Sequence, residues 1–289
     1  MTVPPGDEWA GHTMVFVGGL HRSGTTPLAR CLAAHPQVSG FHGTGVPADE
    51  GQHLQPVYRP AIALGGPGRF AEADGAHLTE RSPAAAAGAG QRLFAAWRPW
   101  WDLSRPVLLE KSPPNLLATR FLQAAFPGAR FIMMVRHPAI VALSTTKWCQ
   151  RGLDGLLGHW FHAHRLLEAD APHLEHLYVV KYEHLVRQPQ RVLASLAAFL
   201  GLAGEVPAVS IGAAHSAGYE RRWAELAAGP DRAGFGEIVR RYQAAAEHYG
   251  YSLRDLHRAG PFPAGPYRRS WAGGAHASSG KRRKYQSSS

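Results

Sequence analysis

The chain has 289 residues, of which 45% are hydrophobic and 18% are charged, and these values indicate a globular protein with a real core. The length suits one large α/β domain or two small ones, and no apolar run approaches the roughly 20 residues of a membrane span. The net charge is +10, which favours an anionic partner such as nucleic acid, an acidic membrane or a small polyanion.

Part of the positive charge lies near the C-terminus, where the run Lys281–Lys284 stands among Ser, Gly and Ala. We expect a single domain over residues 1–270 and a disordered basic tail over residues 271–289. The N-terminus has no basic segment followed by an apolar one, so we expect no signal peptide and a cytoplasmic location. Cys31 and Cys149 are expected to be reduced thiols. Oligomeric state is not predicted.

Strand and helix signals alternate along the chain. Apolar runs predict strands at residues 14–19, 37–41, 107–110, 130–135 and 176–181. Helical patterns are predicted at residues 25–34, 71–101, 138–149, 153–170, 189–200 and 235–249, with another helix after Pro114. Residues 42–70 are rich in Gly and Pro, and such a long loop is usually functional. The alternation predicts an α/β, P-loop-like fold with a central parallel β-sheet flanked by helices.

The turn after the first predicted strand, residues 18–26, reads GGLHRSGTT and is close to a phosphate-binding loop. It follows the Walker A pattern except that Thr25 replaces the lysine that reaches the β- and γ-phosphates of a nucleotide. Arg22 lies inside the loop, and its guanidinium suits phosphate or sulfate oxygens. Backbone N–H groups, hydroxyls and the N-terminus of the next helix add to this anion site. The N–H groups are those from Arg22 to Thr26, with Gly24 among them, and the hydroxyls are those of Ser23, Thr25 and Thr26.

This loop, together with His35-Pro36 behind it, resembles the 5′-phosphosulfate-binding loop of the sulfotransferases, especially of their tyrosylprotein and bacterial members. A second segment, RFIMMVRHPAIVALSTTKW at residues 130–148, resembles the 3′-phosphate-binding segment of that family. This resemblance implies that Arg136 and Ser144 bind the 3′-phosphate. Arg136 would leave the strand at its carboxyl end, and Ser144 would tilt back toward the N-terminus of the following helix.

Two more segments are similar to the same family. VVKYEHLVRQPQRVLASLAAFLGL, residues 179–202, resembles a segment whose tyrosine lines the adenosine pocket, which implies this role for Tyr182. LLEKSPPN, residues 108–115, resembles the E-K-[ST]-P stretch of carbohydrate and tyrosyl sulfotransferases, which places Lys111 near the reacting sulfonate. The resemblance covers roughly residues 14–250.

The resemblance implies that 3′-phosphoadenosine 5′-phosphosulfate (PAPS) is the donor and that adenosine 3′,5′-bisphosphate is the product, with no metal required. PAPS has no γ-phosphate, so the Walker lysine has no task. We expect a small-molecule hydroxyl as acceptor, in a site lined by residues 42–70 and by the helix predicted at 71–101. Arg22 and Lys111 are expected to stabilise charge on the transferred group.

The general base is the point at which this chain departs from its relatives. Tyrosylprotein sulfotransferases carry a glutamate shortly after the His-Pro pair, whereas the aligned position here holds His42, and Glu50 follows eight residues later. Either residue could accept the proton of the acceptor: His42 because imidazole titrates near neutral pH, and Glu50 if it is buried. We favour Glu50 because carboxylate bases dominate the most similar branch.

Two other functions stay open. A P-loop kinase or NTPase is disfavoured by Thr25 and by the lack of a Walker B carboxylate at the ends of the later strands. A nucleic-acid-binding module fits the charge, but no recognisable reading motif accompanies the basic tail. His159, His162 and His164 invite a zinc site, but no cysteine or carboxylate partner accompanies them, so no metal is expected.

Overall fold

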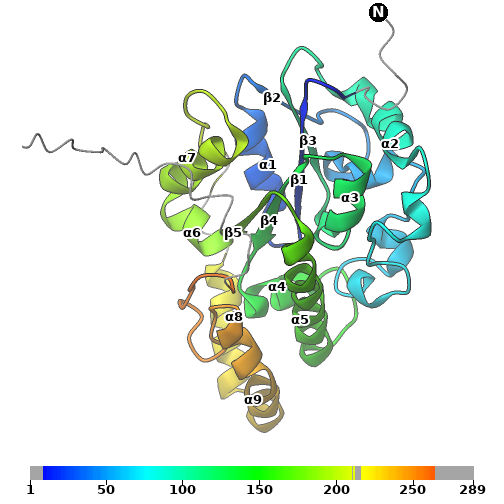
Figure 1. Ribbon diagram of the computed structural model, residues 1–289. Coiled ribbons are helices and arrows are strands. Elements are labelled where there is room, and N and C mark those ends of the chain that lie inside the picture. Colours follow the sequence, from blue (N-terminus) through cyan, green and yellow to red (C-terminus); the bar gives the residue numbers. More distant parts are fainter. Residues whose placement is uncertain (1–8, 210, 212–215, 264–289) are drawn as a thin grey trace, which may run out of the picture.

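The structure, a computed structural model, describes residues 9–209, 211 and 216–263, so the predicted tail at 271–289 lies outside the described residues. Its centre is a five-stranded sheet in the order β2-β3-β1-β4-β5, with every neighbouring pair parallel (Figure 1). The strands are β1 (Thr13–Gly19), β2 (Val38–Gly40), β3 (Val107–Lys111), β4 (Arg130–Val135) and β5 (Leu177–Lys181). The predicted parallel α/β fold and its five strands are confirmed.

The register of the sheet brings the predicted site segments together. Val17 of β1 pairs with Lys111 of β3, and Gly19 of β1 pairs with Met134 of β4. Because all strands run in one direction, their carboxyl ends meet at one edge, where α/β proteins bind ligands. The loop after β1, the end of β3 and the residues after β4 therefore lie beside one another.

Alternate residues of each strand point to opposite faces of the sheet, and each face has its own apolar cluster. Val15 and Val17 pack into a cluster covered by α1 (Thr25–Ala33), α6 (Tyr182–Arg187) and α7 (Pro189–Leu200). Met14 and Phe16 pack into the cluster on the other face. That face is covered by α2 (Ala89–Trp97), α3 (Thr119–Ala125), α4 (Pro138–Thr145) and α5 (Leu153–Asp170).

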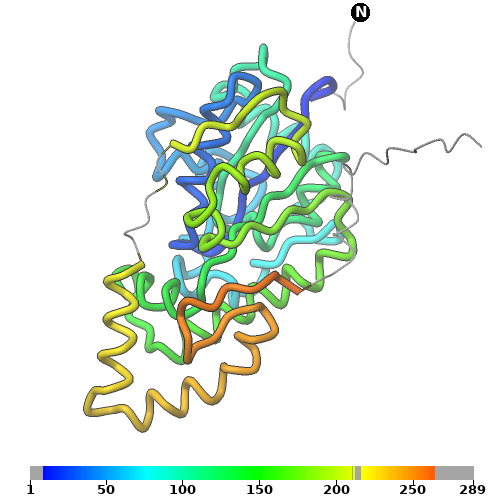
Figure 2. The backbone as a smooth tube through the Cα atoms, turned by 90° about the vertical axis from the view of Figure 1, so that its left-hand side faces the viewer, coloured from blue at the N-terminus to red at the C-terminus, as the bar shows by residue number. Residues whose placement is uncertain are grey.

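Two further helices, α8 (Ala217–Ala228) and α9 (Arg232–His248), form a hairpin beyond one end of the sheet (Figures 1 and 2). It contacts the rest of the molecule through α4 and α5. Trp223 of α8 is buried, packs edge-on against Phe235 of α9 and donates a hydrogen bond to the Leu253 carbonyl at 3.0 Å. Among the described residues, no helix is both long and apolar enough to cross a membrane.

The prediction of one long helix over residues 71–101 is wrong. Only Ala89–Trp97 forms an α-helix there, because Gly75 and Gly88 take left-handed φ values of 76° and 80°, which interrupt a helix. The helix predicted at 138–149 ends at Thr145. Short 3₁₀ turns occupy much of the rest, at Pro47–Asp49, Gly51–His53, Ala61–Leu64, Phe70–Glu72, Pro83–Ala85, Arg98–Trp100, Pro113–Leu117 and Ala171–His173.

Candidate active site

The phosphate loop turns sharply between β1 and α1. Arg22 has a left-handed φ of 70°, and Gly24 at the N-cap of α1 has a φ of 100°. The first N–H groups of a helix have no partner within it, so those at the start of α1 are available to an anion. The Ser23 hydroxyl instead donates to the Leu20 carbonyl at 2.6 Å and closes the loop on itself.

Gly24 is required by the close approach of Tyr182. A Cβ atom at Gly24 would lie 2.5 Å from Cδ2 of the Tyr182 ring, which is closer than side chains pack. The guanidinium of Arg136 also packs on Tyr182, with its central carbon 4.1 Å from the centre of the ring. Three predicted cofactor residues from separate segments are therefore brought together at the loop.

Arg136 fixes the shape of the loop while keeping one donor free. Its Nη1 donates to the Arg22 carbonyl at 2.9 Å, and its Nη2 donates to the Ser216 hydroxyl at 2.7 Å. Its Nε is buried and has no hydrogen-bond partner among the described residues, and burial lowers the pKa of the guanidinium. Ser144 lies deeper, fully buried, and its hydroxyl donates to the Val141 carbonyl at 3.1 Å. Ser216 was not predicted from the sequence.

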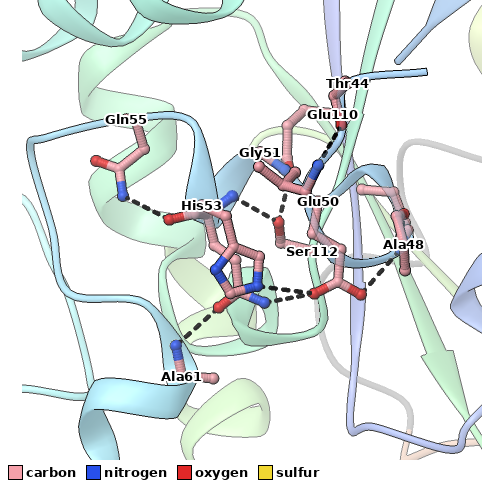
Figure 3. Close-up of polar contacts among 12 residues, drawn as sticks. Thr44, Ala48, Glu50, Gly51, His53, Gln55, Ala61, Glu110 and Ser112 are labelled. Atoms are coloured by element: carbon pink, nitrogen blue, oxygen red, sulfur yellow. Dashed lines mark hydrogen bonds and ion pairs between the residues drawn. The ribbon is translucent and has the colours of Figure 1, made fainter. Parts of the chain in front are cut away.

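Lys111 and Glu50 form a buried ion pair at the end of β3. The Lys111 Nζ lies 2.9 Å from the Glu50 Oε1, and the two side chains are only 6% and 10% exposed. The same Nζ donates to the Ala48 carbonyl at 2.9 Å. The Glu50 Oε2 accepts from the Gln52 amide at 2.5 Å and lies 3.9 Å from His53 Nε2, as Figure 3 shows. Glu50 is thus held on both carboxylate oxygens.

The segment that carries Glu50 has an unusual backbone. Ala48 and Asp49 both take left-handed φ values, 53° and 50°, although neither is a glycine. Each such residue costs roughly 1–2 kcal/mol. The Asp49 carboxylate accepts hydrogen bonds from the backbone N–H and the hydroxyl of Thr44, at 2.8 and 2.7 Å, which lower its pKa and hold the turn. Strained backbone of this kind is found at functional sites.

A second buried carboxylate, Glu110, supports this segment from the opposite side of β3. Side chains alternate along a strand, so Glu110 faces away from its neighbour Lys111. Its Oε1 accepts from the Gly51 N–H at 2.9 Å and from the Ser112 hydroxyl at 2.5 Å (Figure 3). Its Oε2 accepts from the Asn115 amide at 2.5 Å. Burial raises the pKa of Glu110 to about 7. This network was not predicted, although the E-K pair at a strand end signals two opposed polar side chains.

A cavity of about 710 Å³ opens beside Lys111, between α1 and the edge of the sheet at β2. His42 lines it and is exposed, whereas Glu50 is buried behind Lys111. Of the segments predicted to line an acceptor site, this cavity includes His42, Asp49 and Trp100. Its wall from α1 was not predicted.

Two further histidines near the loop, His21 and His159, both pack against Phe70. His21 packs edge-on against Phe70, and burial, with smaller effects of Lys111 and His53, lowers its pKa to about 4. His159 accepts a hydrogen bond from the Ala71 N–H at 3.3 Å. In the part of the chain that the structure describes, no group of three or more His, Cys, Asp or Glu side chains is placed to hold a metal ion.

Comparison with known proteins gives one family. Residues 14–205 match the model of the family described as "Sulfotransferase family". Among solved structures, the sulfotransferase domain of the Synechococcus PCC 7002 olefin synthase is 21% identical, with 66% of this chain and 74% of that chain covered and a TM-score of 0.44. Sulfotransferase STF1 from Mycobacterium tuberculosis H37Rv is 18% identical, with coverage of 66% and 68% and a TM-score of 0.44. Mouse sulfotransferase SULT7A1, complexed with PAP, is 13% identical, with coverage of 76% and 67% and a TM-score of 0.36.

Proposed function

This chain belongs to the sulfotransferase family and transfers a sulfonate group, and on this premise we propose that its donor is PAPS and that its acceptor is a hydroxyl of a small molecule. One observation carries the donor assignment. Arg136 keeps a buried Nε without a hydrogen-bond partner among the described residues, while its other nitrogens bind the phosphate loop and Ser216. Arg136 therefore brings to the phosphate loop a positive charge without a described ion pair and a donor that is not yet used, and a phosphate would suit both.

The residues present fit the two anionic ends of the donor. The loop from Arg22 to Thr26 and the N-terminus of α1 would hold the 5′-phosphosulfate. Arg136 would hold the 3′-phosphate, with Ser144 assisting after a rotation of its hydroxyl away from Val141. Tyr182, placed between Gly24 and Arg136, would contact the nucleoside that joins these ends.

When bound, PAPS supplies an activated sulfonate, whose bond to the 5′-phosphate oxygen breaks as the acceptor oxygen bonds to sulfur. Charge develops on the transferred group and on the leaving oxygen, and fixed donors that face this charge lower the barrier. Arg22 in the loop and Lys111 at the end of the adjacent strand would stabilise this charge.

Glu50, the carboxylate of the Lys111–Glu50 pair, would be the general base. One Glu50 oxygen is occupied by Lys111 at 2.9 Å. When Lys111 turns toward the sulfonate, this oxygen becomes free to accept the proton of the acceptor hydroxyl. His42 is the alternative base, because it lines the cavity beside Lys111 and is open to solvent.

Two measurements test this proposal. Calorimetry should give a higher affinity for adenosine 3′,5′-bisphosphate than for 5′-AMP or ATP; equal affinities for the bisphosphate and 5′-AMP would remove the role of Arg136. Radiolabelled PAPS should then transfer its sulfonate to members of a hydroxyl-compound library in EDTA, a condition that stops a kinase.

The base is tested by two matched variants. Glu50→Gln should lose nearly all turnover and keep its affinity for the bisphosphate, whereas His42→Asn should stay within a few-fold of the wild-type rate. The opposite pattern would assign the base to His42. If both variants stay active, neither residue is the base.

A further inference from the structure

The cavity beside Lys111 runs along one face of α1. Thr26, Ala29, Arg30 and Ala33 line it at the i, i+3, i+4 and i+7 positions that share one side of a helix. Thr26 belongs to the phosphate loop, and Arg30 lies one turn further, about 6 Å along the helix axis. A molecule that fills this cavity from Lys111 along α1 would reach Arg30.

Polar and charged side chains line part of this cavity, and small apolar and aromatic side chains line the rest. Ala29 and Ala33 are small and leave space along the helix, and Leu109 of β3 also lines the cavity. Phe41 and Trp100 line the cavity, and both rings are partly exposed. Aromatic and small aliphatic side chains together suit a flat apolar group.

The charges of the cavity are satisfied except for one. Lys111 is paired with Glu50 at 2.9 Å. Arg105 is paired with Asp102 at 3.1 Å and also donates to the Val38 carbonyl at 2.9 Å. The Asp49 carboxylate is held by Thr44. Arg30 is exposed, and among the described residues its guanidinium has neither a hydrogen bond nor an ion pair.

We propose that the acceptor is a hydroxyaryl carboxylate, whose ring lies between the walls at Phe41 and Trp100 and whose carboxylate binds Arg30. This inference rests on the proposed function and names the substrate class for the same site. Arg30 is a specificity residue in it, because it holds the end of the acceptor that lies away from the transferred sulfonate. The planar guanidinium can bind both carboxylate oxygens at once.

The inference is tested first by binding, with three phenols that differ in charge. 3-(4-Hydroxyphenyl)propanoate, its neutral methyl ester and cationic tyramine are titrated by calorimetry into the protein saturated with adenosine 3′,5′-bisphosphate. We expect the acid to bind most tightly and tyramine most weakly. Arg30→Gln should weaken binding of the acid about 10- to 100-fold, the range for a hydrogen bond to a charged group, and should leave the ester unchanged.

Arg165→Gln is the matched control. Arg165 lies on α5, on the opposite face of the sheet, and is likewise an exposed arginine without a described ion pair. This variant should bind the acid as the wild type does. The kcat/KM values for sulfonation of acid and ester should follow the same pattern, and the preference for the acid should fall as salt is added.

The outcomes separate this inference from the function on which it rests. Equal binding of acid and ester by the wild type, an equal loss of both in Arg30→Gln, or no binding of either phenol would overturn the inference. Binding of the bisphosphate together with sulfonation of other alcohols would then leave the function standing. Failure to bind the bisphosphate or to transfer sulfonate to any acceptor would refute the function itself.

Discussion

Replacing Lys111 with methionine should affect both stability and rate, because Lys111 is half of a buried ion pair. The two side chains are 6% and 10% exposed, so Lys111→Met leaves the Glu50 carboxylate buried without its cation. Breaking a buried pair in this way costs about 3–5 kcal/mol of unfolding free energy. The lower end applies here, about 3 kcal/mol, because the Gln52 amide still donates to Glu50. Loss of the same cation from the transition state should lower kcat about 10²- to 10³-fold.

Urea denaturation, bisphosphate calorimetry and turnover separate these effects. The double variant Glu50→Gln/Lys111→Met removes both charges and should recover much of the lost stability, because replacing a whole buried pair is often nearly neutral. Lys147→Met, at an exposed lysine, should change the unfolding free energy by less than about 0.5 kcal/mol. An unfolding free energy of Lys111→Met within about 1 kcal/mol of the wild-type value would contradict the buried ion pair's contribution to stability. An unchanged kcat would contradict the role of Lys111 in the transition state.

Three more variants test the cofactor site and the buried histidines. Arg136→Ala should raise the KM for PAPS and change kcat little, because a 3′-phosphate contact contributes equally to the ground and transition states; a large fall in kcat alone would contradict this. Gly24→Ala should reduce bisphosphate affinity more than tenfold by calorimetry, because its methyl group would lie 2.5 Å from the Tyr182 ring at a left-handed φ. Burial lowers the pKa of His137 from 6.5 to about 4, so its contribution to stability is complete above pH 6.5 and is lost as the pH falls toward 4. At pH 5 the wild type has lost about 2 kcal/mol of unfolding free energy through this histidine. Between pH 7 and pH 5, the unfolding free energy of His137→Asn, measured by urea denaturation, should therefore fall by about 2 kcal/mol less than that of the wild type.

The sheet was predictable because its strands carry a strong local signal. β1, β3, β4 and β5 each contain a continuous apolar run, as expected for strands buried on both faces. The region before β3 was not predictable in the same way. Its short 3₁₀ turns are held by distant contacts, such as the Trp97 indole N–H bond to the Gly51 carbonyl at 3.0 Å, which leave no periodic pattern. α8 was not predicted either.

The site was also predictable only in part, where its residues are close together in the sequence. The phosphate loop is contiguous in sequence, so Arg22 and Gly24 could be found from their spacing. The Lys111–Glu50 pair joins residues 61 positions apart, and both members were predicted as site residues without their direct contact. The partners behind them, Gln52 and Ser112, are ordinary polar residues in sequence and acquire a role only through burial.

The position of β1 in the middle of the sheet has a consequence for how the chain is made. β1 is synthesised first, yet both of its neighbours, β3 and β4, leave the ribosome roughly a hundred residues later. At synthesis rates of about 5–20 residues per second, this apolar strand waits for several seconds before it can pair. During that time it is exposed to aggregation, so folding in the cell should benefit from a chaperone that binds this strand on the nascent chain.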